Sequence, residues 1–170
     1  NKSYRQLSGG QQQRVLLARA LCASDKIILL DDYYYANETA DVTFYLDVNG
    51  QAFPDEHWTD FAIVVLHWWI TAIITNYFKE TTEFILQLMD GPYYVKCTKH
   101  GPNVHIDCIE DKKRIRTICE GDFVFTEIVQ EVIRISSQII EAVRVHGFGE
   151  LSSLDDLEQS LKQLQSIQSE

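Results

Sequence analysis

The segment TEFILQLMDGPYYVKCTKHGPNVHIDCI, residues 82–109, alternates apolar and polar side chains and is interrupted by two tight turns, which is the pattern of an antiparallel sheet. Phe84, Leu86 and Leu88 occupy every second position, which is the period of a half-buried strand. Asp90-Gly91-Pro92 and the stretch HGPN at residues 100–103 are combinations typical of turns. The pattern therefore predicts three consecutive strands, over residues 82–89, 93–99 and 104–109.

The flanking sequence extends this unit in both directions. A fourth short strand is expected over residues 114–119, ended by a break at Glu120-Gly121-Asp122, so that four strands with short links form an antiparallel meander. Upstream, residues 41–48 alternate as a further strand and lead into Asn49-Gly50, a strong tight-turn signal. Apolar residues at helical spacing predict helices over residues 123–146 and from Ser152 onward. The fold class is therefore α+β, an antiparallel meander sheet packed against long helices.

Residues 58–78 indicate one long helix, and its environment is open to two interpretations. Residues 61–78 carry no formal charge, which is at the lower limit for a membrane span. However, Trp68 and Trp69 lie in the middle of the segment, whereas membrane helices favour tryptophan at their ends. We therefore expect a helix buried in the protein, with a membrane helix as the alternative. Because adjacent helical residues point about 100° apart, one tryptophan is expected in the core and the other near the surface.

The composition is that of a globular chain, because 45% of the 170 residues are hydrophobic and 24% are charged. The four cysteines are widely spaced and no signal peptide is visible, so we expect reduced thiols and a cytoplasmic location. These cysteines are Cys22, Cys97, Cys108 and Cys119.

Charge is distributed unevenly along the chain. Residues 1–32 hold five basic and three acidic side chains, a net charge of +2, whereas residues 33–170 hold 10 basic and 22 acidic ones, a net charge of −12. Such an acidic domain is a poor candidate for binding nucleic acid. It suits a basic protein partner, because opposite charge speeds encounter. Simple solubility is the other explanation of the acidity.

The first residues carry the most specific motif, LSGGQQQR at residues 7–14, followed by VLLARALCASDKIILLDD at residues 15–32. Ser8 suits a helix N-cap, and Gly9 and Gly10 let backbone N–H groups approach a phosphate at the positive end of a helix. Residues 1–32 resemble the signature motif and Walker B element of ABC-transporter ATPases, which implies a helix-strand N-terminal appendage. The resemblance implies nucleotide-binding roles for Ser8, Gly9, Gly10, Gln11, Asp31 and Asp32.

The ABC pattern is incomplete in this sequence. Only six residues precede Leu7, which leaves no room for the P-loop that should come before the signature motif. Asp32 stands where the family has glutamate, and three tyrosines follow it. His67 lies 36 residues after Asp31, near the expected place of the family's switch histidine, but Trp68 follows it rather than an acid. Because the signature motif acts on nucleotide held by a partner's P-loop, we expect no ATP hydrolysis by the chain alone.

Cys97, His100, His105 and Cys108 are the residue types that zinc binds. With Pro102-Asn103 as the turn, Cys97 would pair with Cys108 and His100 with His105. The odd separation of Cys97 and His100 places them on opposite faces of the sheet. We therefore expect the cysteines in the core, the histidines on the solvent-facing side, and no metal site.

The sequence indicates no catalytic residues. It contains no Ser-His-Asp order, HExxH or GxSxG. Acidic side chains near the predicted strand ends are expected to be solvated, as turn carboxylates usually are. These are Asp90, Asp107, Glu110 and Asp111.

Two predicted turns, FPDEHW at residues 53–58 and MDGPYY at residues 89–94, present acids and aromatic rings together. Loops on a rigid scaffold commonly carry binding function, and aromatic rings make effective interface anchors. The partner-binding residues predicted on this basis are Asp55, Glu56, Trp58, Asp60, Asp90, Tyr93 and Tyr94.

The stretches FYLDVNGQAFPDEHWTDFAIVVLHWW, residues 44–69, and FILQLMDGPYYVKC, residues 84–97, resemble in pattern small bacterial immunity-type proteins over residues 42–148. Those are acidic α+β proteins that neutralise toxins by binding them. We therefore divide the chain into an ABC-ATPase-like segment, residues 1–40, and an α+β domain, residues 41–170, that ends in an acidic amphipathic helix.

The resulting hypothesis is a non-enzymatic protein-binding module without a cofactor, with an immunity protein against a basic toxin as the implied role. The alternative is an ABC-transporter ATP-binding subunit or fragment, which would bind ATP and would need a P-loop from another chain.

Overall fold

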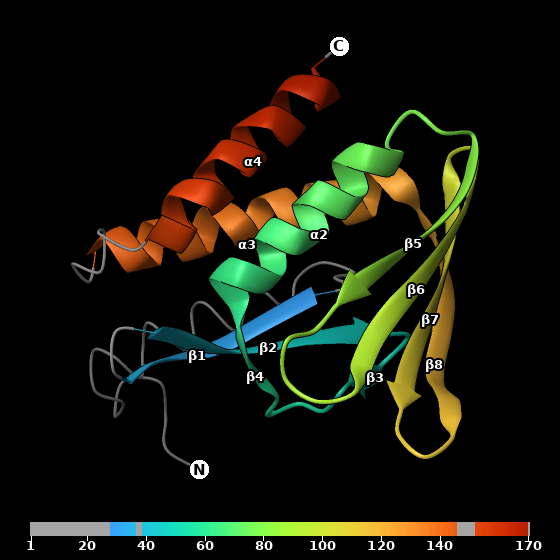
Figure 1. The fold of residues 1–170 in the computed structure, drawn as a ribbon, viewed down its shortest axis with the longest axis horizontal. Helices are drawn as coiled ribbons and strands as arrows, with labels where there is room; N and C mark the ends of the chain where they lie inside the picture. Colours follow the sequence, from blue (N-terminus) through green and yellow to red (C-terminus); the bar gives the residue numbers. More distant parts are fainter. Residues whose placement is uncertain (1–27, 37–38, 146–151, 170) are drawn as a thin grey trace, which may run out of the picture.

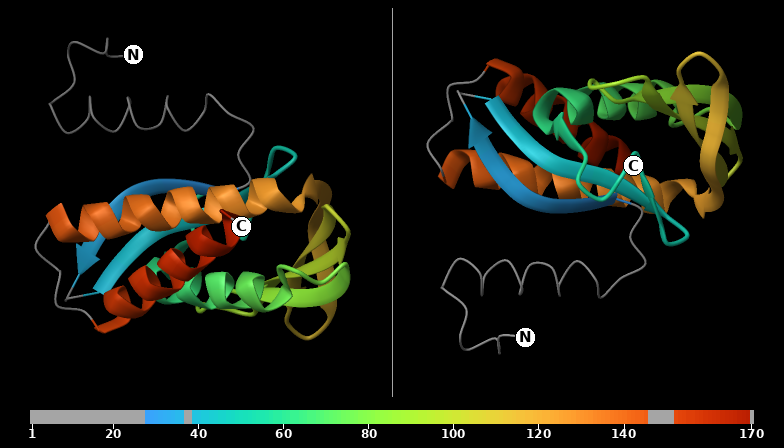
Figure 2. Two further views of the ribbon diagram at one scale, coloured as in Figure 1. Left: turned by 90° about the horizontal axis from the view of Figure 1, so that it is seen from above. Right: turned by 90° about the horizontal axis from the view of Figure 1, so that it is seen from below.

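The computed structural model describes residues 28–36, 39–145 and 152–169, and it places the side chains of residues 43–145 and 153–169. Within these ranges the fold consists of two antiparallel sheets and three helices (Figure 1). The β5–β8 sheet stands at one end of the molecule, and the helices lie beside one another over the other sheet (Figures 1 and 2). The α+β class expected from the sequence is confirmed.

The meander expected from residues 82–109 is the β5–β8 sheet, with the strands in chain order. Every second residue of β5 faces the core, as Phe84 and Leu86 show. The expected break at Glu120-Gly121-Asp122 is wrong, because Glu120 pairs with Asp107 and Asp122 with His105, so that the last strand continues. The strands are β5 (Thr81–Gln87), β6 (Tyr93–His100), β7 (Asn103–Asp111) and β8 (Ile115–Val124).

The β6–β7 register differs from the expected one by two residues. Gly101 and Pro102 form the turn, with Gly101 at φ +57°, so Cys97 pairs with Ile106 and Thr98 with His105. A shift of two residues leaves every side chain on its original face, because the side-chain period of a strand is two. The expected faces are therefore confirmed: Cys97 and Cys108 are buried, whereas His105 lies on the outer face.

The second sheet is built around β2 (Thr39–Val48). β1 (Ile28–Ala36) pairs with one edge of β2, and β3 (Gln51–Phe53) and β4 (Thr59–Phe61) pair along the other. The expected turn at Asn49-Gly50 is confirmed, with φ angles of +56° and +80°. β1 continues through Asp31 and Asp32, where its register shifts, and ends after the three tyrosines. The division of the chain between residues 40 and 41 stays a prediction, and β1 and β2 pair across it.

The helices are α2 (Ala62–Asn76), α3 (Phe125–Val145) and α4 (Ser152–Gln168). The helix expected from residue 58 begins later, because residues 59–61 pair with β2 as strand β4. α2 packs against α4, α3 and β5, and eight of its 15 residues are buried. In the part of the chain that the structure describes, no helix is long and apolar enough to cross a membrane.

Trp69 of α2 connects the two sheets. Its indole is fully buried, lies 5.2 Å from the Phe44 ring of β2, and donates a hydrogen bond of 2.7 Å from Nε1 to the carbonyl of Gln87 at the end of β5. Its neighbour Trp68 is 40% exposed. One tryptophan therefore belongs to the core and the other to the surface, as the helical geometry predicts.

Trp69→Phe should lower the free energy of unfolding by about 2 kcal/mol or more, because it removes the Nε1 hydrogen bond and leaves a cavity in the core. The matched control Trp68→Phe should change it by no more than about 0.5 kcal/mol, since that ring lies at the surface. Urea unfolding of both variants measures the difference. If both variants lower the free energy of unfolding equally, the face of α2 that carries Trp69 is not the one packed against the sheets.

Candidate functional site

The two turns that the sequence singled out meet in space, and the carboxylate of Asp60 holds them together. Asp60 Oδ2 accepts hydrogen bonds from the backbone N–H of Met89 at 3.1 Å, from that of Asp90 at 3.4 Å and from Trp58 Nε1 at 3.4 Å. Asp60 is 1% exposed, and burial raises its pKa while these hydrogen bonds oppose the rise. Asp60 therefore positions the two turns, and its side chain is buried rather than presented at the surface.

Three aromatic rings pack where the turns meet. The Trp58 and Tyr93 rings meet edge-to-face with centroids 5.1 Å apart, and the Phe53 and Tyr93 rings also meet edge-to-face, at 5.7 Å. Gly91, at φ +70°, passes so close that a Cβ there would lie 2.9 Å from the Tyr93 ring and 3.0 Å from that of Trp58. Glycine at this position therefore allows both the left-handed backbone and the close contact with the rings.

Tyr93 also belongs to a charged group that the sequence did not indicate. Its hydroxyl lies 3.3 Å from Glu110 Oε1 and accepts a hydrogen bond of 3.2 Å from Lys112, whose ammonium also sits 5.3 Å from the ring centroid. Glu110 is buried and forms ion pairs with Lys112, at 2.6 Å, and with Arg116. The hydrogen bonds from Lys112 and then Arg116 hold the pKa of Glu110 at about 2.

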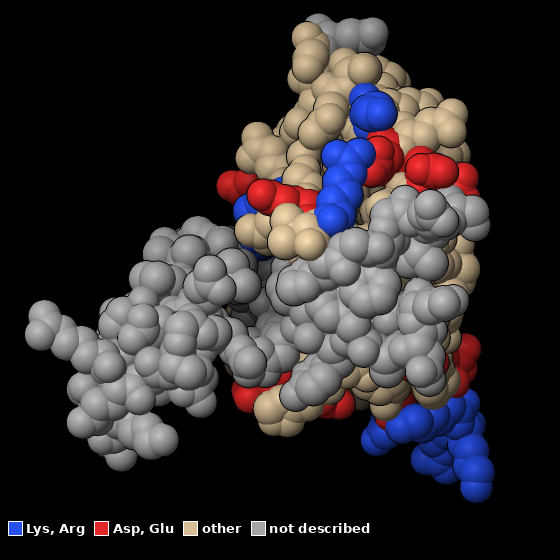
Figure 3. Space-filling view, turned by 90° about the vertical axis from the view of Figure 1, so that its left-hand side faces the viewer, with Lys and Arg blue, Asp and Glu red and all other residues tan. Residues whose placement is uncertain are grey.

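The turn between β7 and β8 is strongly basic although the chain as a whole is acidic. Four exposed cations lie within five residues, together with Ile115, which is 66% exposed. Figure 3 shows Lys and Arg side chains protruding at the lower end of the molecule, where Figure 1 places this turn. In the sequence, the run DKKRIR at residues 111–116 indicates this concentration of positive charge. We call these residues, Lys112, Lys113, Arg114 and Arg116, the basic hairpin.

The structure brings most of the predicted partner-binding residues together. Trp58 is half-buried beside Tyr93, and Asp90 is exposed in the adjoining turn. Asp55 and Glu56 are exposed in the loop before Trp58. Tyr94 is separated from them, because adjacent strand residues point to opposite faces, and it lies on the outer face of the β5–β8 sheet. The resulting aromatic surface is formed by Trp58 and Tyr93 with the exposed acids Asp55, Glu56 and Asp90.

The residues assigned to nucleotide by resemblance are placed only in part. Ser8, Gly9, Gly10 and Gln11 lie outside the described residues. Asp31 and Asp32 lie in β1, at its register shift. His67 lies in α2 with its Nδ1 3.3 Å from Ser160 Oγ of α4, so it contributes to a helix–helix contact.

Comparison with known proteins finds similarity at the N-terminal end. Residues 1–34 match the ABC transporter family. A relative, the general L-amino acid transport ATP-binding protein AapP of Rhizobium johnstonii (strain DSM 114642 / LMG 32736 / 3841), is 62% identical over 32 residues, which are 19% of this chain and 12% of that protein. No solved structure matches the chain. None of these matches is a toxin-immunity protein, so that resemblance gains no support from them.

The pairing of Glu110 should stabilise the protein in a pH-dependent way. Because the folded-state pKa is lowered from 4.5 to about 2, the contribution is complete above pH 4.5 and is lost as the pH falls towards 2. The melting temperature of Glu110→Gln should therefore lie below that of the parent at pH 7 and approach it as the pH falls through this range. The exposed neighbour Asp111→Asn is the control. A difference that stays constant from pH 7 to pH 2 would show that Glu110 is not held as a paired carboxylate.

Proposed function

We propose that this chain is a component of an ABC-type ATP-binding assembly, in which residues 1–34 contribute the signature segment to a nucleotide held by the P-loop of another subunit. The match of residues 1–34 to the ABC transporter family carries this proposal. The identity to an amino-acid transport ATP-binding protein over 32 residues supports it. The sequence Ser8-Gly9-Gly10 combines a residue type favoured as a helix N-cap with two glycines, a combination that is expected to suit a phosphate.

The strand β1 ties this segment to the rest of the protein. β1 begins within the matched residues and makes its backbone pairs with β2, which lies outside the match. β2 in turn carries Phe44, which contacts Trp69 in the core. We call the part of the protein outside the matched residues the body. Because β1 pairs with β2, a nucleotide bound by the matched segment would attach the body to the assembly in a fixed position.

Photo-crosslinking with an azido-ATP probe tests the nucleotide role. The chain alone should neither hydrolyse ATP nor be labelled, whereas mixing it with an ABC ATP-binding protein that has an intact P-loop should give labelled chain. Gly9→Asp should abolish the label, because it places bulk and negative charge where a phosphate would approach. The control Ser3→Asp adds the same charge ahead of the motif and should keep the label. Labelling that survives Gly9→Asp, or ATP hydrolysis by the isolated chain, would contradict the proposal.

A second function, protein binding through the aromatic surface, is favoured by the convergence of two separate turns on Trp58 and Tyr93. The surface offers a ring with exposed acids around it, and net charge −12 over residues 33–170 favours a basic partner. The basic hairpin adjoins Tyr93, so such a partner would approach from the side of Asp55 and Glu56. Neutralisation of a basic toxin is one case of this binding, and it rests on the pattern of the sequence alone.

Variants of the two charged sides distinguish this binding from simple solubility. With a basic partner captured from the source cell, Asp55→Asn with Glu56→Gln should slow association, whereas Lys113→Gln should speed it. Trp58→Ala should speed dissociation by about 30-fold if the ring is a hot spot worth ~2 kcal/mol, and Trp68→Ala, an exposed tryptophan elsewhere, should not. Surface plasmon resonance measures both rates. If none of the three charge changes alters the association rate, the acidity serves solubility and not partner binding.

A further inference from the structure

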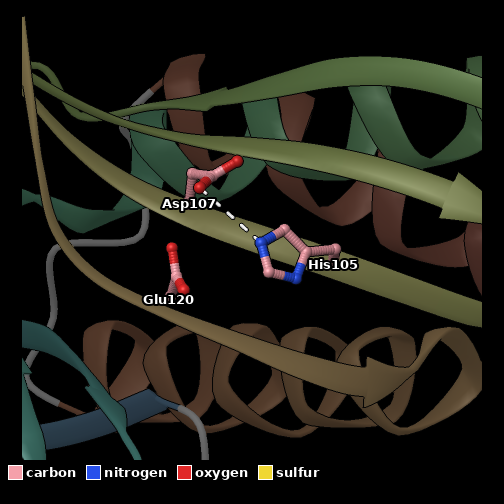
Figure 4. A group of neighbouring side chains, drawn as sticks. All are labelled: His105, Asp107 and Glu120. Carbon is pink, nitrogen blue, oxygen red and sulfur yellow. Dashed lines mark ion pairs between the residues drawn. The ribbon is translucent and has the colours of Figure 1, made fainter.

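The outer face of the β5–β8 sheet carries a histidine among carboxylates, away from the aromatic surface. His105 and Asp107 are two residues apart on β7 and so share a face, and Glu120 and Asp122 lie opposite them on β8. One ligand atom from each of His105, Asp107 and Glu120 lies within 4.8 Å of the other two. Figure 4 shows the carboxylate of Glu120 rising from the neighbouring strand towards the gap between the other two side chains.

The orientation of His105 is fixed by Asp122. His105 Nδ1 lies 2.8 Å from Asp122 Oδ1, the distance of a strong hydrogen bond, so the ring carries its proton there and directs Nε2 towards Asp107. Histidines that bind metals almost always donate their other N–H to a carboxylate or carbonyl in this manner. Asp122 therefore lies where a residue that orients a metal-binding His105 imidazole is expected.

The separation of His105 Nε2 and Asp107 Oδ1 is within ion-pair distance, and it also suits two ligands of one bound ion. His105 Nε2 lies 3.6 Å from Asp107 Oδ1, which is too long for a hydrogen bond. Two ligands that each sit about 2.1 Å from a tetrahedral ion are about 3.4 Å apart, which is close to this distance.

The charges of the cluster also favour a cation. Three carboxylates surround one imidazole, and the nearby cation Lys96, opposite Asp107 in the register, is held by Glu83 at 3.0 Å. The side chains of His105 and Asp107 are 36% and 24% exposed, so an ion can reach them from solvent.

We propose that His105 Nε2, Asp107 and Glu120 bind one divalent transition-metal ion of the zinc type, with Asp122 positioning the histidine. A mixed nitrogen and oxygen ligand set favours Zn²⁺, Co²⁺ or Mn²⁺, whereas Ca²⁺ and Mg²⁺ take oxygen ligands. Three protein ligands leave the fourth position to water. This site shares His105 with the set of Cys97, His100, His105 and Cys108 but differs from it in the other ligands, because the two cysteines face the core.

Titration calorimetry of the full chain with Zn²⁺ tests the site. The parent should bind one equivalent that is lost in His105→Gln and in Glu120→Gln. Asp122→Asn should weaken binding by about 10- to 100-fold, because it releases the ring. His100→Gln, an exposed histidine on the neighbouring strand, is the matched control and should bind as the parent does. Thermal melts check that each of these surface variants is folded.

Three results would overturn the proposal. The first is the absence of Zn²⁺ binding by the parent. The second is unchanged affinity and stoichiometry in both His105→Gln and Glu120→Gln, which would place the ion elsewhere, for example on a thiol. The third is displacement of Zn²⁺ by equimolar Ca²⁺, which would show that the site does not prefer a transition-metal ion.

Discussion

The buried indole of Trp69 is the contact on which the rest of the described structure depends. It touches Phe44 of β2 on one side and bonds the last residue of β5, Gln87, on the other, so one side chain fixes both sheets against α2. The bond to Gln87 also sets the start of the following turn. That turn places the amides of Met89 and Asp90 on the carboxylate of Asp60, and so brings Tyr93 against Trp58. The aromatic surface is therefore a consequence of how the core is packed.

The charge of the body is organised by the β7–β8 pair. Its turn carries the four cations of the basic hairpin, whereas its middle carries the carboxylates around His105 on the outer face. The net charge of residues 33–170 does not reveal that basic and acidic side chains lie in different places, because the acids outnumber the bases. A partner that reaches this end of the molecule meets acids beside Trp58 and bases beyond Tyr93, so orientation as well as attraction would be set by charge.

The strands and their faces could be predicted from the sequence because the alternation of side chains has a period of two. The β6–β7 register could not, since HGPN allows either Gly101-Pro102 or Pro102-Asn103 as the turn. Gly121 looked like a break but lies within β8, where a Cβ would come 2.8 Å from the Phe123 ring and 3.1 Å from Asn49. A glycine in a strand can mark a close approach as well as a turn.

Some residues of each candidate site could not be predicted from the sequence. Trp58, Asp90 and Tyr93 could be predicted to act together because both turns combine acids and rings. The ion-paired role of Glu110 could not, because Arg116 lies opposite it only through the register of β7 and β8. Likewise, Glu120 and Asp122 lie opposite Asp107 and His105 only because β8 continues beyond residue 119, where the sequence predicted a break.

The ABC-like segment is joined to the rest of the protein through the pairing of β1 with β2. Amide hydrogen exchange, followed by mass spectrometry of peptides from residues 28–36 and 43–48 in the full chain, tests it most directly. Amides in β1 should be protected to a degree comparable with those in β2, because the two strands share their hydrogen bonds. Exchange of residues 28–36 at the rate of an unstructured peptide, while residues 43–48 stay protected, would contradict it.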